Sequence, residues 1–280
     1  MNNFFRRTLT GAWIVILVMG GFLLHPVSFF LTGLVILIGT QYEYYQMIRN
    51  IGVRPQMVPG IIIGVTAYTI STLIAVRVIP KNSFLVLIPL MLIIMVTELY
   101  RKQDKPFDSL AHTFFSVLYT VVPFSMFPFS AFLRTGLNSI LPHENIIFSP
   151  GIIIGFFLLI WANDTGAYLT GISIGRHKLF ERISPKKSWE GFFGGMIIAT
   201  IVAWLLSDWL GVVERIHWVF IAVIVSIAGT YGDLIESMLK RSIGVKDSGT
   251  IMPGHGGFLD RFDSAIISFP LVYLFITLFG

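Results

Sequence analysis

The 280-residue chain is 55% hydrophobic and 12% charged, with a mean hydropathy of +0.79, whereas soluble domains carry roughly 25% charged residues. This composition excludes a soluble globular domain and predicts an all-α integral membrane protein, because helices satisfy their own backbone groups in lipid. The chain has no cysteine, which excludes disulfides, thiolate metal sites and cysteine nucleophiles. The net charge of +5 needs no nucleic acid, since basic loops facing anionic lipid or an anionic substrate account for it.

Nine apolar runs follow one another along the chain, and each approaches the length of a transmembrane helix. We therefore predict a single transmembrane domain over residues 1–280, built as a polytopic helical bundle. The first run lacks a small-residue cleavage site and further spans follow it, so we expect a span rather than a signal peptide. The runs cover residues 9–24, 28–47, 57–79, 83–99, 109–132, 150–170, 190–208, 217–238 and 262–279.

The distribution of Lys and Arg predicts the orientation, because basic residues in short loops favour the cytoplasmic side. With the N-terminus inside, most basic residues fall in inner loops, and the outer side receives Arg77, Lys81, Arg134 and Arg215. The N-terminus is therefore predicted to be cytoplasmic.

The segment Gln41–Arg49, "QYEYYQMIR", ends the second apolar run. Its tyrosines resemble an aromatic belt at the inner membrane interface, and Glu43 is interpreted as part of that structural feature. Residues 1–149 are thus expected to form a helical scaffold, and residues 150–280 the catalytic half.

A few carboxylates lie inside or at the ends of apolar runs, where an unpaired charge is costly. Asp164 lies near the end of the sixth run, and Asp233 and Glu236 lie one helical turn apart in the eighth. Asp260 and Asp263 open the ninth run with the same spacing. Three helices thus bring hard oxygen ligands to one level, which favours a divalent cation such as Mg²⁺.

A structural interpretation of the same carboxylates stays open. Asp260 precedes a predicted helix and is suited to an N-cap, and Glu236 can reach Lys240 four residues later.

Basic and glycine-rich segments occupy the same predicted inner face: "SPKKSWEGFFGG", "LKRSIGVK" and "PGHGG". Lys and Arg form charge-assisted hydrogen bonds to phosphate oxygens, and glycines let backbone N–H groups approach an anion. Together with a metal they indicate phosphoryl or nucleotidyl transfer. Taken alone, each segment also has a structural explanation. A basic loop commonly determines membrane topology, and "GHGG" can form a tight turn. His255 is expected to contact phosphate rather than metal, because no second His lies at ligand spacing.

The run from Ser237 to Asp263 resembles a family signature: "SMLKR", then "KDSG", then "MPGHGGFLDRFD". This long pattern with fixed spacing is similar to that of the phosphatidate cytidylyltransferases, the CDP-diacylglycerol synthases. Residues 163–178, 184–191 and 229–241 also resemble the family. The resemblance covers the chain from about residue 160 onward.

The resemblance implies the reaction of CTP with phosphatidic acid to give CDP-diacylglycerol and pyrophosphate. It further implies dependence on Mg²⁺, with K⁺ as a possible second cation, and a homodimer in the bilayer of a bacterial cytoplasmic membrane, with the active site facing the cytoplasm.

The resemblance also implies roles for individual residues. Asp233 and Asp260 are the leading metal ligands, with Asp164 and Asp263 as further ligands or their supporting partners. Lys240, Arg241 and Lys246 would hold the triphosphate and the departing pyrophosphate. The remaining residues expected to bind substrate or to orient those that do are Lys186, Lys187, Ser237, Asp247, His255, Gly256, Gly257 and Arg261.

Three alternative functions share features with this sequence. A polyprenol or dolichol kinase also joins a nucleotide to a membrane lipid, but lacks the long signature. A CDP-alcohol phosphotransferase pairs its aspartates four apart, whereas Asp260 and Asp263 are three apart. An ion-coupled transporter places carboxylates near the midplane, often in related halves, and no halves are detectable.

Overall fold

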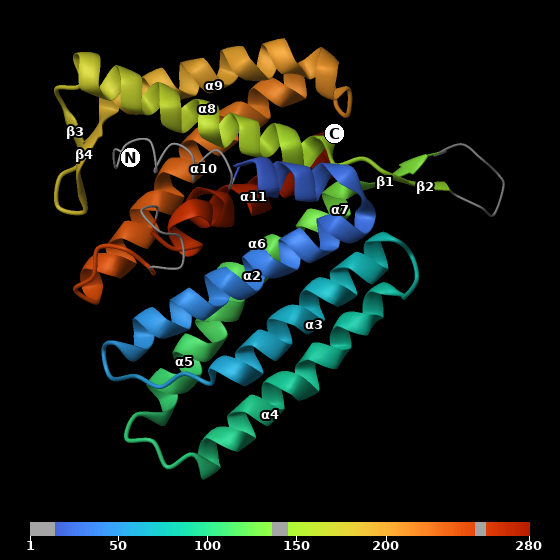
Figure 1. Ribbon diagram of the computed structural model, residues 1–280, viewed down its shortest axis with the longest axis vertical. Helices are drawn as coiled ribbons and strands as arrows, with labels where there is room; N and C mark the ends of the chain where they lie inside the picture. The colour runs from blue at the N-terminus through green and yellow to red at the C-terminus, as the bar shows by residue number, and fades with distance from the viewer. Residues whose placement is uncertain (1–14, 136–144, 250–255) are drawn as a thin grey trace, which may run out of the picture. The chain divides into compact units, whose positions relative to one another are not determined.

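The computed structural model describes residues 15–135, 145–249 and 256–280 (Figure 1). The chain divides into two compact units, so that residues 247–261 belong with the N-terminal part. The first unit comprises residues 1–148 and 247–261, and the second comprises residues 149–246 and 262–280. The prediction of a single membrane domain stays a prediction.

The first unit is a bundle of helices that follow the predicted apolar runs (Figure 1). A short apolar helix, Val15–Leu24, precedes them. The antiparallel pair β1 and β2 closes this part of the chain, with Phe132 opposite Phe148. The elements are α2 (Pro26–Arg49), α3 (Met57–Ala75), η1 (Lys81–Val86), α4 (Leu87–Tyr100), α5 (Pro106–Ser116), η2 (Val117–Val121), α6 (Val122–Ser125), α7 (Phe127–Ala131), β1 (Phe132–Thr135) and β2 (Asn145–Phe148).

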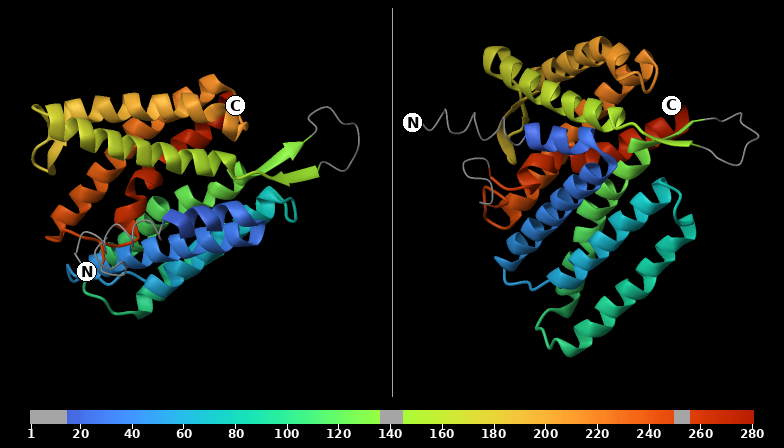
Figure 2. Two further views of the ribbon diagram at one scale, coloured as in Figure 1. Left: turned by 45° about the horizontal axis from the view of Figure 1, so that its top comes forward. Right: turned by 45° about the vertical axis from the view of Figure 1, so that its right-hand side comes forward.

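The second unit packs four long helices and a short hairpin. Helices α8 and α9 run side by side in antiparallel directions, as both views in Figure 2 show. Ser188 caps the N-terminus of α9 by accepting a hydrogen bond from the Gly191 N–H at 3.1 Å. The elements are α8 (Gly151–Ile174), β3 (Lys178–Phe180), β4 (Ser184–Ser188), α9 (Trp189–Leu210), α10 (Arg215–Ser242) and α11 (Leu259–Phe279), which begins in the first unit.

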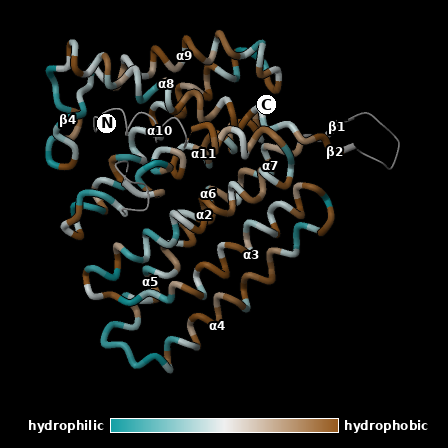
Figure 3. Tube along the Cα trace, viewed as in Figure 1, coloured by the Kyte–Doolittle hydropathy of each residue, from teal (hydrophilic) through white to brown (hydrophobic). Residues whose placement is uncertain are grey.

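Eight helical segments of the described residues are long and apolar enough to cross a membrane, which confirms the polytopic helical bundle. Each matches one of the predicted runs. The first predicted run, residues 9–24, lies partly outside the described residues. Figure 3 shows the helices coloured mainly hydrophobic, with hydrophilic colour at the α2–α3 and α4–α5 loops.

The fifth predicted run is one span but not one continuous α-helix. A π-helical turn, Val117–Val121, separates α5 from α6, and Pro123 and Pro128 stand in the first turns of α6 and α7. Proline lacks the backbone N–H that a helix interior needs, so each one starts a new helical piece. The prolines therefore divide the helix without changing the number of spans.

Aromatic packing forms the core of each unit. In the first unit, Phe22 contacts Phe29 and Phe127 with ring centroids 5.1 and 6.0 Å apart. In the second, Phe156 of α8 packs edge-on against Phe269 of α11 at 5.0 Å.

The interpretation of Gln41–Arg49 as an interfacial aromatic belt is wrong. Tyr44 and Tyr45 are fully buried, and Tyr44 forms a 2.8 Å hydrogen bond with the His112 ring. Gln41 of the same helix donates a hydrogen bond to the carbonyl of Gly60 in α3. These side chains face the α3 and α5 helices because the polar atoms of this segment find protein partners there.

Candidate active site

Three carboxylates gather in the second unit and form what we call the acidic cluster: Asp233 and Glu236 of α10 and Asp263 of α11. One oxygen of each lies within 4.8 Å of the others. Asp233 and Glu236 lie together because residues three apart in a helix share a face, and Asp263 comes from the neighbouring helix. Gly232 lets the helices meet, since a Cβ there would come within 2.6 Å of the Asp263 carbonyl oxygen.

Two lysines neutralise part of the acidic cluster. Lys187 of β4 forms an ion pair with Asp233, and Lys240 forms one with the fully buried Glu236. Asp233 also accepts a 3.3 Å hydrogen bond from the Ser237 hydroxyl. A fully buried carboxylate such as that of Glu236 is stable only when it is paired or bound to a cation.

The other predicted site residues of the second unit lie near the acidic cluster or at the surface. Asp164 is exposed on α8 and is close enough to Asp263 to interact with it electrostatically, although it is not one of the three grouped carboxylates. Arg241 is exposed and donates a 3.5 Å hydrogen bond to the Val245 carbonyl. Lys186 and Lys246 are also exposed.

The hairpin that carries Lys187 is attached to the start of α9. Glu190 accepts hydrogen bonds from the His177 backbone N–H and, at 2.6 Å, from the His177 ring. The backbone N–H of Trp189 donates to the His177 carbonyl at 2.9 Å. Because both ends of the hairpin are held in this way, the backbone around Lys187 has a defined position beside α9.

The first unit holds a second group, which we call the loop clamp: Glu43, Ser248, Gly257, Leu259 and Asp260. Glu43 of α2 is 2% exposed, and one of its oxygens accepts hydrogen bonds from the Ser248 hydroxyl at 3.0 Å and from the Leu259 N–H at 2.9 Å. The clamp therefore ties α2 to both sides of residues 249–256.

Asp260 is the second carboxylate of the loop clamp. It accepts hydrogen bonds from the Ser248 N–H at 3.0 Å and from the Gly257 N–H at 2.8 Å. Gly257 must be a glycine here, because a Cβ would overlap the Glu43 carboxylate and the Ser248 hydroxyl. Backbone donors on a carboxylate stabilise its charged form. Asp260 lies inside the first turn of α11 and is not its N-cap.

Not every predicted residue is part of these two groups. Asp247 and Arg261 are exposed in the first unit, and Gly256 adopts a left-handed backbone with φ +77°. His255 lies outside the described residues.

The sequence pattern described as the cytidylyltransferase family matches residues 5–279. The chain belongs to the cytidylyltransferase family. The match extends well before residue 160, so the first half of the chain is part of the family pattern rather than an unrelated scaffold.

Relatives within this family of cytidylyltransferases carry a more specific name. A stretch of 124 residues is 46% identical to "Phosphatidate cytidylyltransferase" of Bacillus subtilis (strain 168), covering 44% of this chain and 46% of that protein. Another of 118 residues is 49% identical to the protein of the same name from Staphylococcus haemolyticus (strain JCSC1435), covering 41% and 45%. The aligned part spans less than half the length of these relatives.

Sequence reasoning missed the place of Glu43 in the loop clamp. The signal was present, since a glutamate inside an apolar run is costly and needs a partner. Its three tyrosine neighbours gave a competing explanation, and its partner Ser248 is 205 residues away. The four-residue spacing of Glu236 and Lys240 allows an ion pair between them, and that ion pair is confirmed.

Proposed function

We propose that this chain transfers a cytidylyl group from CTP to phosphatidic acid, giving CDP-diacylglycerol and pyrophosphate in phospholipid biosynthesis. The observation that carries the proposal is the acidic cluster with its two paired lysines, in a chain that belongs to the cytidylyltransferase family. The names of the relatives supply the lipid substrate.

The donor set of the acidic cluster fits Mg²⁺, because three carboxylate oxygens within 4.8 Å are hard ligands at short range. We propose that Asp233, Glu236 and Asp263 hold it, with Asp164 as a supporting carboxylate. When bound, Mg²⁺ would offset the negative charge of the phosphates. Asp260 is assigned to positioning because its described hydrogen bonds come from backbone N–H groups.

The chemical step is in-line displacement at the α-phosphorus of CTP. A phosphate oxygen of phosphatidic acid forms the new bond to that phosphorus, and the bond to the oxygen bridging to the β-phosphate breaks as pyrophosphate leaves. No general base is required, since a phosphate monoester is already anionic near neutral pH. The protein's task is to place two anions together and to offset their repulsion.

Lysine side chains are proposed to offset the repulsion between the two anionic substrates. Lys187 and Lys240 are tethered to carboxylates, so their ammonium groups have defined positions from which to bind phosphate oxygens. The exposed Lys186, Arg241 and Lys246 are proposed to capture the nucleotide phosphates or the lipid headgroup.

The loop clamp lies on both sides of the glycine-rich part of the signature. Glu43 and Asp260 accept hydrogen bonds from Ser248 before it and from Gly257 and Leu259 at its end. We propose that backbone N–H groups of this part of the signature contact phosphate, with Glu43 as a positioning residue.

The bacterial organisms of the relatives support a location in a bacterial membrane. We propose that the chain is a multi-pass protein of the cytoplasmic membrane with its active site facing the cytoplasm. A homodimer and a second cation such as K⁺ remain part of the proposal.

The test is pyrophosphate release by purified protein in detergent, given CTP, phosphatidic acid and Mg²⁺, with each component omitted in turn. Asp233→Asn should lower the rate at least about a hundredfold. Asp208→Asn is the matched control, because Asp208 makes an exposed ion pair with Arg215 in the same unit. Release without phosphatidic acid, or an unaffected Asp233→Asn protein, would refute the proposal. Transfer of phosphate from ATP to the lipid, in place of a reaction with CTP, would identify a lipid kinase. Pyrophosphate release in detergent, where no ion gradient exists, would exclude an ion-coupled transporter.

A further inference from the structure

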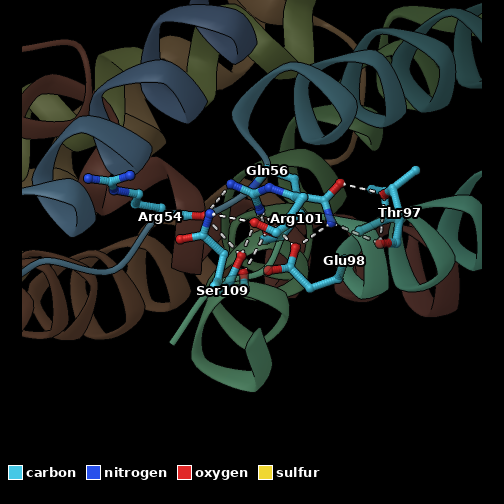
Figure 4. A network of polar contacts seen from close by, with 9 residues as sticks. Arg54, Gln56, Thr97, Glu98, Arg101 and Ser109 are labelled. Carbon is cyan, nitrogen blue, oxygen red and sulfur yellow. Dashed lines mark hydrogen bonds and ion pairs between the residues drawn. The ribbon is translucent and has the colours of Figure 1, made fainter. Parts of the chain in front are cut away.

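A polar network joins two loops at one end of the first unit (Figure 4). The Arg101 guanidinium donates hydrogen bonds to Glu98 at 2.8 Å, to the Ser109 hydroxyl at 3.0 Å and to the Arg54 carbonyl at 2.8 Å. The α2–α3 loop is thereby attached to the α4–α5 loop.

The network continues into the interior of the unit. The Gln56 side-chain NH₂ donates to the Glu98 carboxylate at 2.6 Å, and the Thr97 hydroxyl donates to the Gln56 side-chain oxygen Oε1 at 2.8 Å. Gln56 and Glu98 are 5% and 3% exposed. A buried and connected network of this kind holds both loops in one arrangement.

The held loops enclose a cavity of about 540 Å³ lined by residues 51–54 and 101–105. A neighbouring cavity of about 370 Å³ shares Gly52, Arg54 and Arg101 and adds Arg49. We call these two cavities together the basic pocket. Its cations are Arg49, Arg54, Arg101, Lys102 and Lys105, and its lining contains a single acidic residue, Asp104.

Most of this positive charge is uncompensated. Arg101 is paired with Glu98, whereas Arg49, Arg54, Lys102 and Lys105 are exposed and form no ion pair with the described part of the chain. Lys102 has φ +47°, in the left-handed region that side chains rarely adopt. The pocket is therefore a preformed cationic concavity.

Apolar side chains flank the basic pocket. Leu99, Tyr100 and Phe107 are each about 80% exposed beside the α4–α5 loop. An exposed aromatic and aliphatic edge next to cations is typical of the membrane interface, where basic pockets bind lipid headgroups.

We propose that the basic pocket binds the phosphate group of an anionic phospholipid. The cations would contact the phosphate, and the flanking apolar residues would lie along the first carbons of the acyl chains. This site uses none of the residues of the acidic cluster or the loop clamp, and its occupancy does not depend on the proposed reaction. A basic loop that only determines topology requires charge but no pocket, so binding distinguishes the two explanations.

The experiment uses the full chain purified in uncharged detergent, without CTP, and titrated with dioctanoyl phosphatidylglycerol. Native mass spectrometry counts the bound lipids, and microscale thermophoresis gives the affinity. In the variant Arg54→Gln/Lys102→Gln/Lys105→Gln we expect one bound lipid fewer and at least about tenfold weaker binding, since each lost contact is charge-assisted.

The matched control removes three exposed cations elsewhere, in Lys81→Gln/Lys178→Gln/Arg182→Gln, and should keep the wild-type count. An equal loss in both variants would mean nonspecific charge attraction and would overturn the proposal, as would unchanged binding in the first variant. Inorganic phosphate is the second arm. If it displaces the lipid at equal concentration, the pocket is a site for free phosphate rather than for a lipid.

Discussion

The Glu43 carboxylate accepts a hydrogen bond from the Ser248 hydroxyl at 3.0 Å, although 205 residues separate them in the chain. The same oxygen accepts the Leu259 N–H. Glu43 is on α2, whereas Ser248 and Leu259 flank the glycine segment of the family signature. The first half of the chain is thus physically connected to the segment that the sequence associates with phosphate binding.

Replacement of Glu43 tests this connection. Glu43→Gln keeps the size of the side chain but removes the charge that strengthens both hydrogen bonds, each worth about 1.5–3 kcal/mol. We expect pyrophosphate release to fall at least about tenfold and backbone hydrogen exchange to rise within residues 248–259. Thr40→Val is the control, because Thr40 is also fully buried on α2 and, among the described residues, its hydroxyl donates only to carbonyls of its own helix. Equal exchange in both variants would argue against a positioning role.

Gly257 offers an independent test of the loop clamp. Gly257→Ala should strongly reduce activity, since its Cβ would overlap the Glu43 carboxylate and the Ser248 hydroxyl. Gly20→Ala is the control, because a Cβ at that position meets no atom of the described residues within 4 Å beyond its own stretch of helix. Adding Glu43→Asp to Gly257→Ala shortens the opposing side chain and should recover part of the activity. Failure of any recovery would show that relieving the overlap with Glu43 alone is not sufficient, because the overlap with the Ser248 hydroxyl remains.

Variants of the Glu236–Lys240 ion pair distinguish its effect on protein stability from its effect on activity. Lys240→Gln leaves the buried Glu236 without this cation, which should cost about 3 kcal/mol of unfolding free energy. The double variant Glu236→Gln/Lys240→Gln removes both charges, so thermal unfolding in detergent should return toward wild type while activity stays low. Recovery of activity together with stability would mean that the pair is structural.

Metal binding is measurable without substrate. Mg²⁺ at about one hundred times its dissociation constant should stabilise the protein by about 2.7 kcal/mol, because it binds only the folded state. Asp263→Asn should abolish the Mg²⁺-induced rise in unfolding temperature, and Asp208→Asn should retain it. An unchanged rise in the Asp263→Asn protein would place the metal elsewhere.

The helices were predictable because apolar length is a local property, and eight predicted runs coincide with eight described segments. The acidic cluster was partly predictable for a similar reason. Asp233 and Glu236 are one turn apart on one helix, and a carboxylate in an apolar run requires a partner.

Contacts over long sequence distances were not predictable. The pairing of Lys187 with Asp233 and of Glu43 with Ser248 depends on how separate helices pack, which no local pattern records. The Arg101 network was missed for the same reason, since the sequence presents its members as ordinary loop residues of a membrane protein.

The long reach of Glu43 also has a consequence for biosynthesis. Ribosomes add about 5–20 residues per second, so the 205 residues between Glu43 and Ser248 take about 10–40 s to make. During that interval α2 enters the membrane before the donors of its carboxylate exist. Burial of the Glu43 charge without these donors would be costly. The first unit therefore reaches its final packing only after the start of α11 has been synthesised.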